Sequence, residues 1–462
     1  MTDLSASLAG DVLDELRARL RGPLLTPADS AYDAARGLFF GDFDPRPAAI
    51  ARVADASDVA TVVEFARRTG AELAVRAGGH SAAGHGSVDG GIVLDLRAMK
   101  GLAIDRASRT AWAEAGLTAR ELADAAARDG LAIGFGDTGS VGIAGLTLGG
   151  GIGYLVRKHG LTIDSLLGAD VVTADGSLVR ADETSHPDLF WAIRGGGGNF
   201  GVVTRFRFRL HELDSIVGGV LVLPATPALV ADFVDAAEAA PHELSAIANV
   251  MPAPPLPFLP QEAVGRPIVL ATLVHAGGGE PGERAVAPFR ALASPIADLV
   301  RPMGYPEIYP PDDESYRPKA IARTLFVDTI DRASATTIVD ALQASGGALR
   351  AVQIRVLGGA VARVPADATA YAHRASRIIV NVAALYDDPA ERDARRTRVE
   401  ALAAAIRRDD PGAYVNFLAD EGPDRVRAAY PEPTWSRLAA IKARYDPTNL
   451  FRRNHNIPPA TA

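Results

Sequence analysis

Two glycine-rich segments place the strongest constraint on how this chain can fold. The first reads RAGGHSAAGHGS over residues 76–87 and comes after AELAV, which has the pattern of a short strand. The second covers residues 136–166. Glycine lets backbone N–H groups approach phosphate oxygens without obstruction by a side chain. A single loop around His80 would be read as an ordinary turn, but two such loops can clasp an extended dinucleotide. Together they predict a site for a diphosphate cofactor.

The second segment also contains a spacing that suggests a different fold. Gly134, Gly136 and Gly139 match the GxGxxG pattern of a Rossmann dinucleotide site. The next residues form another glycine-rich stretch rather than the helix that opens a βαβ unit. The context therefore argues against a Rossmann domain.

Local patterns predict helices alternating with strands. Ser57 precedes apolar residues at helical spacing and Gly70 ends the run, which indicates a capped amphipathic helix. Thr118 and Glu121 have the spacing of a capping box. The Asp-Gly pair at 175–176 lies between two β-rich runs and predicts a hairpin. This alternation is typical of an α+β protein.

The length of 462 residues exceeds the size at which one hydrophobic core usually keeps growing, so two domains are expected. A change of domain is predicted near residue 210, before a middle region of weaker pattern with Pro-rich and Gly-rich loops. After residue 410 the sequence again has the pattern of a packed domain. There Trp435, Leu438, Ile441 and Tyr445 occupy one helical face.

Composition excludes several classes of function. The net charge of −8 and the lack of a basic block leave little to hold a nucleic acid. The chain has no cysteine, which excludes thiolate catalysis, disulfides and iron–sulfur clusters. No His and carboxylate spacing fits a metal site, so no metal is expected. No membrane segment or basic leader is evident, and a cytoplasmic location is expected.

Seven motifs carry a resemblance to a known family. They are RPAAI (46–50), RAGGHS (76–81), VGIAGLTLGGGIGYLVRKHGLTID (141–164), VTADG (172–176), PDLFWAIRGGGGNFGVVTRF (187–206), YVNF (414–417) and RYDPTNLFRRNHNIPP (444–459). In order and spacing the chain resembles the berberine bridge enzyme-like family. This family belongs to the FAD-linked oxidases with the vanillyl-alcohol-oxidase (PCMH-type) FAD domain.

The resemblance implies an α+β fold in two parts. A PCMH-type FAD-binding domain would comprise residues 1–210 and 415–462. Residues 211–414 would form a substrate domain, an antiparallel β-sheet backed by helices. The active site would lie where the two domains meet, a frequent place for ligand pockets.

The resemblance also implies FAD as cofactor, bound covalently from His80 to the 8α-methyl group of the flavin. Many relatives add a second bond from a cysteine, but Thr138 stands at that position, so a single bond is expected. The residues implied to bind FAD are Arg76, Gly78, Gly79, His80, Ser81, Gly84, Thr138, Val141, Gly142, Gly145, Gly149, Gly150, Gly151, Gly153, Gly201, Val203, Asn416 and Asn454.

For the reaction, the resemblance implies hydride transfer to flavin N5 from a carbon that bears a hydroxyl or amine. Tyr414 is the candidate base, because in sugar-oxidising relatives this tyrosine faces the flavin. Val141 would lie beside the flavin edge and leave room for O₂, which would reoxidise the flavin and give H₂O₂. Sugars, glycosylated compounds, amines and other secondary metabolites remain open as substrates.

This chain differs from the plant enzymes at catalytic positions, so their substrates and catalytic residues cannot be assigned to it. Arg363 stands where the berberine-type enzyme has its glutamate base, and Ala82 and Ile152 stand where plant alcohol oxidases have tyrosines. His159 and His373 are interpreted as structural. Two alternatives stay open: a dehydrogenase of the same fold with an acceptor other than oxygen, and a flavin-holding protein without turnover.

Overall fold

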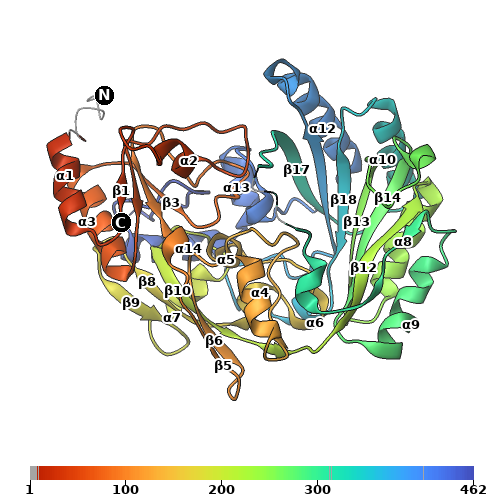
Figure 1. Ribbon diagram of the computed structural model, residues 1–462, viewed down its shortest axis with the longest axis horizontal. Coiled ribbons are helices and arrows are strands. Elements are labelled where there is room, and N and C mark those ends of the chain that lie inside the picture. Colours follow the sequence, from red (N-terminus) through yellow and green to blue (C-terminus); the bar gives the residue numbers. More distant parts are fainter. Residues whose placement is uncertain (1–7, 9, 312, 314, 409, 462) are drawn as a thin grey trace.

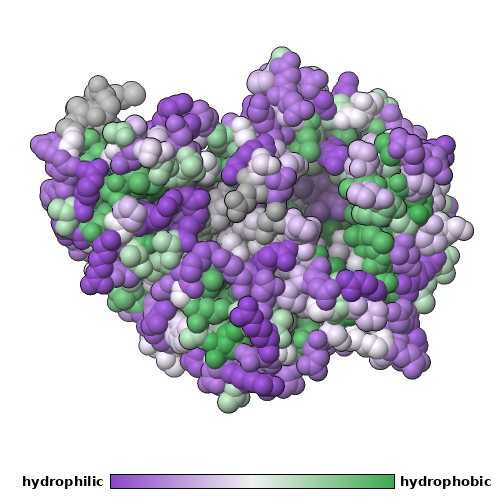
Figure 2. All heavy atoms as spheres, in the orientation of Figure 1, coloured by the Kyte–Doolittle hydropathy of each residue, from purple (hydrophilic) through white to green (hydrophobic). Residues whose placement is uncertain are grey.

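The computed structural model describes residues 8, 10–311, 313, 315–408 and 410–461. The chain forms two lobes that lie side by side (Figure 1). The first lobe combines the N-terminal half with the C-terminal helices, and the second is a large sheet with helices on its outer face. A recess opens between the lobes on the face shown in Figure 2.

A small sheet with parallel central strands carries the first glycine-rich segment. Its order is β1-β2-β4-β3, with β2 and β3 both parallel to β4. Helix α3 (Ala56–Thr69) ends at Gly70 as expected, and the backbone of Gly70 is left-handed. Its N-cap is Asp55, whose carboxylate accepts from the N–H groups of Ser57 and Asp58, so the prediction that Ser57 caps this helix was wrong. The strands are β1 (Leu24–Leu25), β2 (Ala49–Arg52), β3 (Leu73–Arg76) and β4 (Ile92–Asp95).

An antiparallel sheet of five strands completes the core of the first lobe, in the order β5-β6-β10-β8-β9. The predicted capping box of Thr118 and Glu121 is present at α4 (Ala119–Ala127), and the Asp-Gly turn joins β8 to β9 as predicted. A separate two-stranded sheet pairs β7 with β11. The strands are β5 (Leu102–Asp105), β6 (Thr110–Glu114), β7 (Leu131–Ala132), β8 (Leu166–Val172), β9 (Leu178–Ala181), β10 (Val202–Arg209) and β11 (His211–Glu212).

The second lobe is an eight-stranded antiparallel sheet. Its order is β15-β12-β14-β13-β18-β19-β17, and β16 also pairs with β12. The strands are β12 (Ile216–Pro224), β13 (Leu244–Pro252), β14 (Pro267–His275), β15 (Ala297–Asp298), β16 (Arg301–Met303), β17 (Ala320–Val327), β18 (Ala351–Val356) and β19 (Ile378–Leu385).

Four helices cover the outer face of this sheet and bury its alternate apolar residues (Figure 1). They are α8 (Pro227–Ala239), α9 (Gly279–Arg290), α10 (Arg332–Ala344) and α12 (Arg392–Ile406). Because side chains alternate across a strand, the intervening residues face the first lobe. The inner face is therefore free to take part in a site.

Shorter elements connect these layers. The remaining helices are α1 (Gly10–Arg19), α2 (Tyr32–Arg36), α5 (Ile143–Leu148), α6 (Val156–His159), α7 (Pro187–Ile193), α11 (Ala360–Arg363), α13 (Pro423–Ala429) and α14 (Thr434–Tyr445). Short 3₁₀ turns are η2 (Leu96–Ala98), η3 (Thr162–Ser165), η4 (Gln261–Ala263), η5 (Tyr305–Ile308), η6 (Pro389–Glu391) and η7 (Val415–Phe417). Among the described residues, no helix is both long enough and apolar enough to cross a bilayer.

Helix α14 returns the end of the chain to the first lobe, as its apolar face predicts. Leu438, Ile441 and Tyr445 are buried there. Lys442 is fully buried too, and its ammonium donates to the Asn199 carbonyl at 2.7 Å, the Phe451 carbonyl at 3.0 Å and the Asp446 carboxylate at 2.6 Å. All three donors of the lysine are therefore used.

We expect Lys442→Met to lower the free energy of unfolding by about 3–5 kcal/mol, because the buried Asp446 carboxylate would lose its counter-charge. The control is Lys100→Met, which breaks an exposed pair with Glu121 and should cost less than about 1 kcal/mol. Urea unfolding followed by circular dichroism measures both. Equal, small losses in the two variants would contradict a stabilising role for the buried pair.

Candidate active site

The two glycine-rich segments meet at Gly78 and Gly142. A Cβ atom placed on Gly78 would lie 2.3 Å from the Gly142 nitrogen, and one placed on Gly142 would lie 2.3 Å from the Gly78 nitrogen. Cβ atoms essentially never approach another atom this closely, so a side chain at either position would force the facing backbone to shift. The Val141 carbonyl carbon lies at the same contact. The predicted approach of the two loops is thus present.

Arg76 lies beneath the first loop, at the end of β3. Its side chain is 1% exposed and pairs with Asp95 at 3.0 Å. Burial lowers the pKa of Arg76 to about 10, so the group keeps its charge at neutral pH. Its Nε and Nη1 atoms have no hydrogen-bond partner among the described residues, and neither has the Ser87 hydroxyl. Buried donors of this kind require a partner, and an anionic group would supply one.

His80 lies on this loop against an aromatic ring. Its imidazole stacks on Phe39 with ring centres 4.1 Å apart and planes 19° apart. The preceding Gly79 has a φ of +73° and accepts a hydrogen bond from the Phe39 N–H at 3.2 Å. Gly84, on the same loop, has a φ of +69° and lies against Phe43. Ser81 is half-buried and accepts from the Ala83 N–H.

Tyr414 lies against the second glycine loop. Its side chain is 2% exposed, and its oxygen accepts hydrogen bonds from the Gly151 N–H at 3.0 Å and from Asn416 Nδ2 at 2.9 Å. Asn416 is oriented by a second bond, which it donates to the Leu146 carbonyl. Gly149 lies where a side chain would overlap the Asn416 amide. The YVNF motif is therefore bound to the second glycine loop.

The protonation of Tyr414 is set by these surroundings. Burial raises the pKa of Tyr414 to about 12, against the opposing effect of the Asn416 and Gly151 donors. The phenol is therefore protonated at neutral pH. Its oxygen nevertheless has two N–H donors in place that would stabilise a phenolate.

Arg355 joins the second lobe to the same loop. It lies on the inner face of β18, is 4% exposed and forms an ion pair with Asp137. It also donates to the Ile152 carbonyl at 3.4 Å and to the Gln353 side chain at 2.8 Å. Thr138 donates to the same Asp137. One guanidinium thus connects the sheet of the second lobe to the loop that holds Tyr414.

Neutral polar side chains continue from Arg355 across the inner face of the sheet. Gln353 donates to Asn249 at 3.1 Å on one neighbouring strand and lies opposite Asn381 on the other. Asn381 in turn accepts from Thr324 at 3.0 Å. We call Asn249, Gln353, Asn381 and Thr324 the polar row. It presents amide and hydroxyl groups but no charge of its own.

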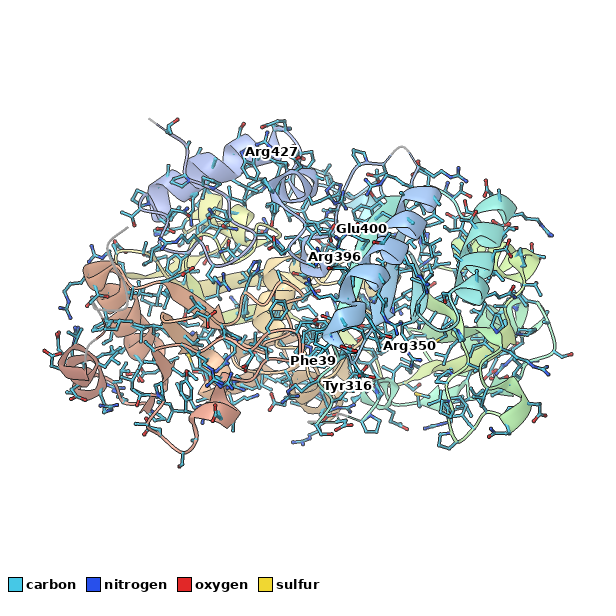
Figure 3. All side chains as sticks on the ribbon, turned by 90° about the horizontal axis from the view of Figure 1, so that it is seen from above. Phe39, Tyr316, Arg350, Arg396, Glu400 and Arg427 are labelled. Atoms are coloured by element: carbon cyan, nitrogen blue, oxygen red, sulfur yellow. The ribbon has the colours of Figure 1, made fainter. Side chains whose placement is uncertain are left out.

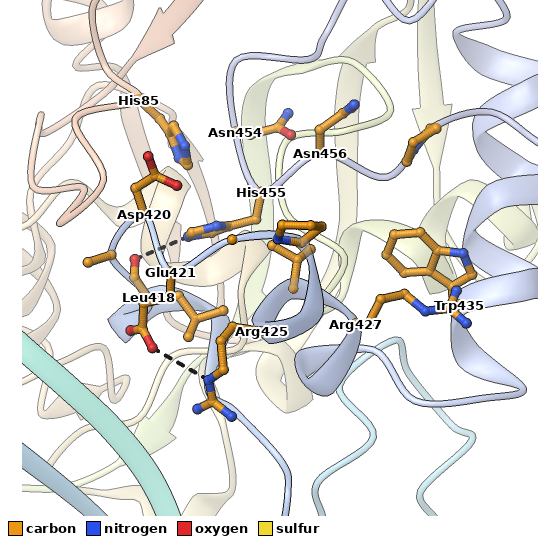
Figure 4. A pocket seen from close by; sticks show the side chains of 15 residues that line it. His85, Leu418, Asp420, Glu421, Arg425, Arg427, Trp435, Asn454, His455 and Asn456 are labelled. Atoms are coloured by element: carbon orange, nitrogen blue, oxygen red, sulfur yellow. Dashed lines mark hydrogen bonds and ion pairs between the residues drawn. The ribbon is translucent and has the colours of Figure 1, made fainter. Parts of the chain in front are cut away.

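The C-terminal segment contacts the first glycine-rich loop. Arg453 Nε donates to the Ser87 carbonyl at 3.1 Å, and His455 lies edge-on to His85 with ring centres 4.7 Å apart. A pocket of about 560 Å³ opens here, lined also by Asn454 and by the loop after YVNF (Figure 4). Burial lowers the pKa values of His85 and His455 to about 3 and 4, so both rings are neutral.

Other predicted residues lie around these loops. Gly150 and Gly151 have φ values of +132° and +83°, and Gly153 packs against the Phe135 carbonyl. Gly145 is exposed on α5, with nothing within 4 Å of a Cβ placed on it. Gly201 precedes β10 and lies against Val171 of β8, and Val203 lies in β10, where it pairs with the same Val171. Val203 therefore belongs to the five-stranded sheet and Gly201 lies directly before it, so neither residue is part of the two glycine loops.

His159 and His373, which were interpreted as structural, pack against other protein groups. His159 stacks on His211 with ring centres 3.9 Å apart, and His373 bonds to the Ala429 carbonyl at 3.1 Å. Burial lowers the pKa of His159 to about 3. Within the described ranges, no group of three His, Asp or Glu side chains is placed to hold a metal ion.

The observed cradle fits FAD. A diphosphate needs N–H donors and a cation, which the glycine loops and the unpartnered nitrogens of Arg76 would supply. The Asn454 Oδ1 atom, also buried without a partner among the described residues, would accept from an N–H or O–H group of the cofactor. His80 and Tyr414 belong to, or contact, the two loops that meet at this cradle.

Comparison with known proteins agrees with this geometry. Residues 47–182 match the model of the FAD binding domain, and residues 413–458 match that of berberine and berberine-like proteins. The chain is 32% identical over 461 residues to (R)-6-hydroxynicotine oxidase of Paenarthrobacter nicotinovorans, covering 95% of this chain and 97% of the relative. The chain belongs to the berberine bridge enzyme-like family. It is an FAD-linked oxidoreductase.

A solved structure and one further relative support the fold and the class of enzyme. The crystal structure of 6-hydroxy-D-nicotine oxidase from Arthrobacter nicotinovorans superposes with a TM-score of 0.84 at 30% identity, covering 96% of this chain and 98% of that one. Xylooligosaccharide oxidase of Thermothelomyces thermophilus is 30% identical, over 97% of this chain and 94% of the relative. The predicted berberine bridge enzyme-like fold is thereby confirmed.

Sequence reasoning missed several residues of the site. Three of them lie outside the seven family motifs: Phe39, Asp137 and Arg355. The polar row lies on strands that contain none of these motifs. Buried Asn199 also went unmarked, although it bonds to the His455 carbonyl and to the Ile457 N–H. An arginine and a glutamine in otherwise apolar β18 were the available signal.

We expect Gly78→Ala to weaken FAD binding, because its methyl group would overlap the backbone of Gly142. Strain of about 1–3 kcal/mol corresponds to a loss of about 5- to 100-fold in affinity. The ratio of flavin to protein absorbance after purification measures the loss. Gly10→Ala is the control, since nothing lies within 4 Å of a Cβ placed there. Full flavin content in Gly78→Ala would show that the close approach is not needed.

Proposed function

We propose that this protein is an oxidase that holds FAD covalently through His80 and removes a hydride from a small molecule at a carbon bearing a hydroxyl or amine. Dioxygen would then reoxidise the flavin and give H₂O₂. The observation that carries the proposal is the Tyr414 oxygen, held by two N–H donors next to the cofactor cradle. Such a group can take the proton that must leave with the hydride.

The inner face of the second lobe supports a polar, uncharged substrate. The polar row offers amide and hydroxyl groups for hydrogen bonds, and the charge of Arg355 is already balanced by Asp137. An oligosaccharide or a hydroxylated amine would match these groups. Relatives named for 6-hydroxynicotine and for xylooligosaccharides agree with this class.

In the reaction, the chain's own residues position the substrate and move one proton. The flavin, when bound, supplies the two-electron chemistry. The polar row would orient the substrate over the first lobe, and Tyr414 would accept the O–H or N–H proton. Gly151 and Asn416 would stabilise the resulting charge on the Tyr414 oxygen. Arg355 would hold the loop and the sheet in register while this occurs.

The substrate class and the electron acceptor can be tested separately. Anaerobic mixing with xylobiose and with 6-hydroxynicotine should bleach the flavin absorbance for at least one of the two. Exposure of the reduced protein to air in a stopped-flow instrument should then restore the absorbance and give H₂O₂. Slow reoxidation in air would show instead a dehydrogenase with another acceptor, and no bleaching by any compound of either class would argue against turnover.

We expect the yellow colour of the purified protein to stay with the polypeptide after acid precipitation, and His80→Ala to release it, because the imidazole nitrogen is the proposed tether. Intact-mass measurement should show one FAD for each wild-type chain. The control is His242→Ala, a change of an exposed histidine that should leave the flavin attached. Release of flavin from the wild type would refute the covalent bond.

We expect Tyr414→Phe to slow anaerobic flavin reduction by about 10²- to 10⁴-fold, the usual contribution of a positioned acid or base. The ring packing and the flavin spectrum should stay unchanged. Since the pKa of Tyr414 is raised to about 12, the phenolate fraction increases with pH below that value. Reduction by a sugar substrate should therefore accelerate from about pH 7 to about pH 9 in the wild type but not in the variant.

The matched control for this change is Tyr430→Phe. Tyr430 is also buried and donates its hydroxyl hydrogen to the Gly195 carbonyl at 3.2 Å. Loss of that hydroxyl should leave the reduction rate nearly unchanged. A drop in flavin content with an unchanged rate in Tyr414→Phe would show that Tyr414 is structural.

A further inference from the structure

Residues 38–43 form a segment, here called the strap, that lies between the His80 loop and the second lobe. Leu38 packs close to Gly79 and Gly86 of the loop. The next residue, Phe39, donates its N–H to the Gly79 carbonyl at 3.2 Å. One end of the strap is therefore attached to the loop by both backbone and side-chain contacts.

Phe39 determines how the His80 ring can lie. The two rings are stacked, with centres 4.1 Å apart and an angle of 19° between their planes. A stack of this kind restricts rotation of the imidazole. Both nitrogen atoms lie in the plane of the imidazole, so the stack also fixes the plane in which they lie. Phe39 itself contacts Phe40 and Tyr316, and Tyr316 belongs to the second lobe (Figure 3).

The other end of the strap is bound to the second lobe. The Gly41 N–H donates to the Pro318 carbonyl at 2.9 Å. The Asp42 carboxylate accepts from the Ala320 N–H at 2.8 Å and from the Tyr386 hydroxyl. Gly41 has no room for a side chain, since a Cβ there would lie 2.7 Å from the Arg317 carbonyl oxygen. Docking of the second lobe thus fixes the position of Phe39.

We propose that Phe39 is a positioning residue for covalent flavin attachment, and that the contacts of Asp42 with the second lobe keep it in place. This inference rests on the proposed bond from His80. Attachment forms a bond between an imidazole nitrogen of His80 and the 8α carbon of FAD, and breaks one N–H and one C–H bond. Two electrons and two protons are then taken by dioxygen to give H₂O₂. The stack on Phe39 would keep the His80 imidazole in one orientation while this bond forms.

The test compares Phe39→Leu, which keeps apolar volume but removes the flat ring, with Phe39→Tyr, which keeps the ring. Full-length protein made by cell-free translation without flavin is incubated with FAD, and samples are acid-precipitated over time. Total flavin is read by absorbance, covalent flavin by intact mass, and folding by circular dichroism. Phe39→Leu should slow attachment by about 10- to 100-fold, since small misplacements of reacting groups have effects of this size. Total FAD binding should be unchanged, and Phe39→Tyr should match the wild type.

A second variant acts at a distance from His80. Tyr386→Phe removes one contact of Asp42, leaves the stacked rings untouched, and should also slow attachment, though less. If Phe39→Leu and Tyr386→Phe both attach FAD at the wild-type rate, the positioning role is overturned while the His80 bond stands. If the wild type itself releases its FAD on precipitation, the proposed bond and this inference fail together.

Discussion

The contact between the backbones of Gly78 and Gly142 is the constraint on which the site depends. It is the point at which two loops far apart in the sequence touch, and no side chain could be accommodated between them. From one loop comes His80, and from the other comes the Gly151 N–H that binds Tyr414. The absence of a side chain at these two glycines thus sets where His80 and Tyr414 lie relative to one another. Ordering glycine costs more conformational entropy than ordering other residues, and the packing of the neighbouring sheets offsets this cost.

The site also depends on the balance of charge where the two lobes meet. Arg355 is nearly buried, and such a group is tolerated only with a compensating partner, which Asp137 provides from the first lobe. Its guanidinium also donates to the Ile152 carbonyl and the Gln353 side chain. The same residue therefore joins the lobes, supports the loop next to Tyr414 and leads into the neutral polar row. A lobe contact built on hydrogen bonds suits a site that must admit polar molecules.

Much of the fold and part of the site could be predicted from sequence. Local features, which depend only on residues close in sequence, were found where expected. Examples are the Thr118 capping box and the Asp-Gly hairpin. The helix cap was assigned to Ser57 because a hydroxyl before an apolar run is a good cap, but Asp55 is two residues earlier and its carboxylate reaches both free N–H groups. The pair of Asp137 and Arg355 spans 218 residues, and the Phe39–His80 stack joins a loop to a segment with no motif. Neither contact follows from a pattern in the sequence, because the residues come together only when the sheets fold.

The return of α14 to the first lobe has a consequence for synthesis. Asn199 is held by the carbonyl of His455 and the N–H of Ile457, and Lys442 joins the same buried cluster. These contacts link positions at least 243 residues apart, and the whole second lobe is inserted between them. On the ribosome the sheet of the second lobe can assemble while the first lobe still lacks its last helix. Flavin capture is therefore a late event, and the unfinished first lobe exposes an apolar surface during translation that chaperones would have to protect.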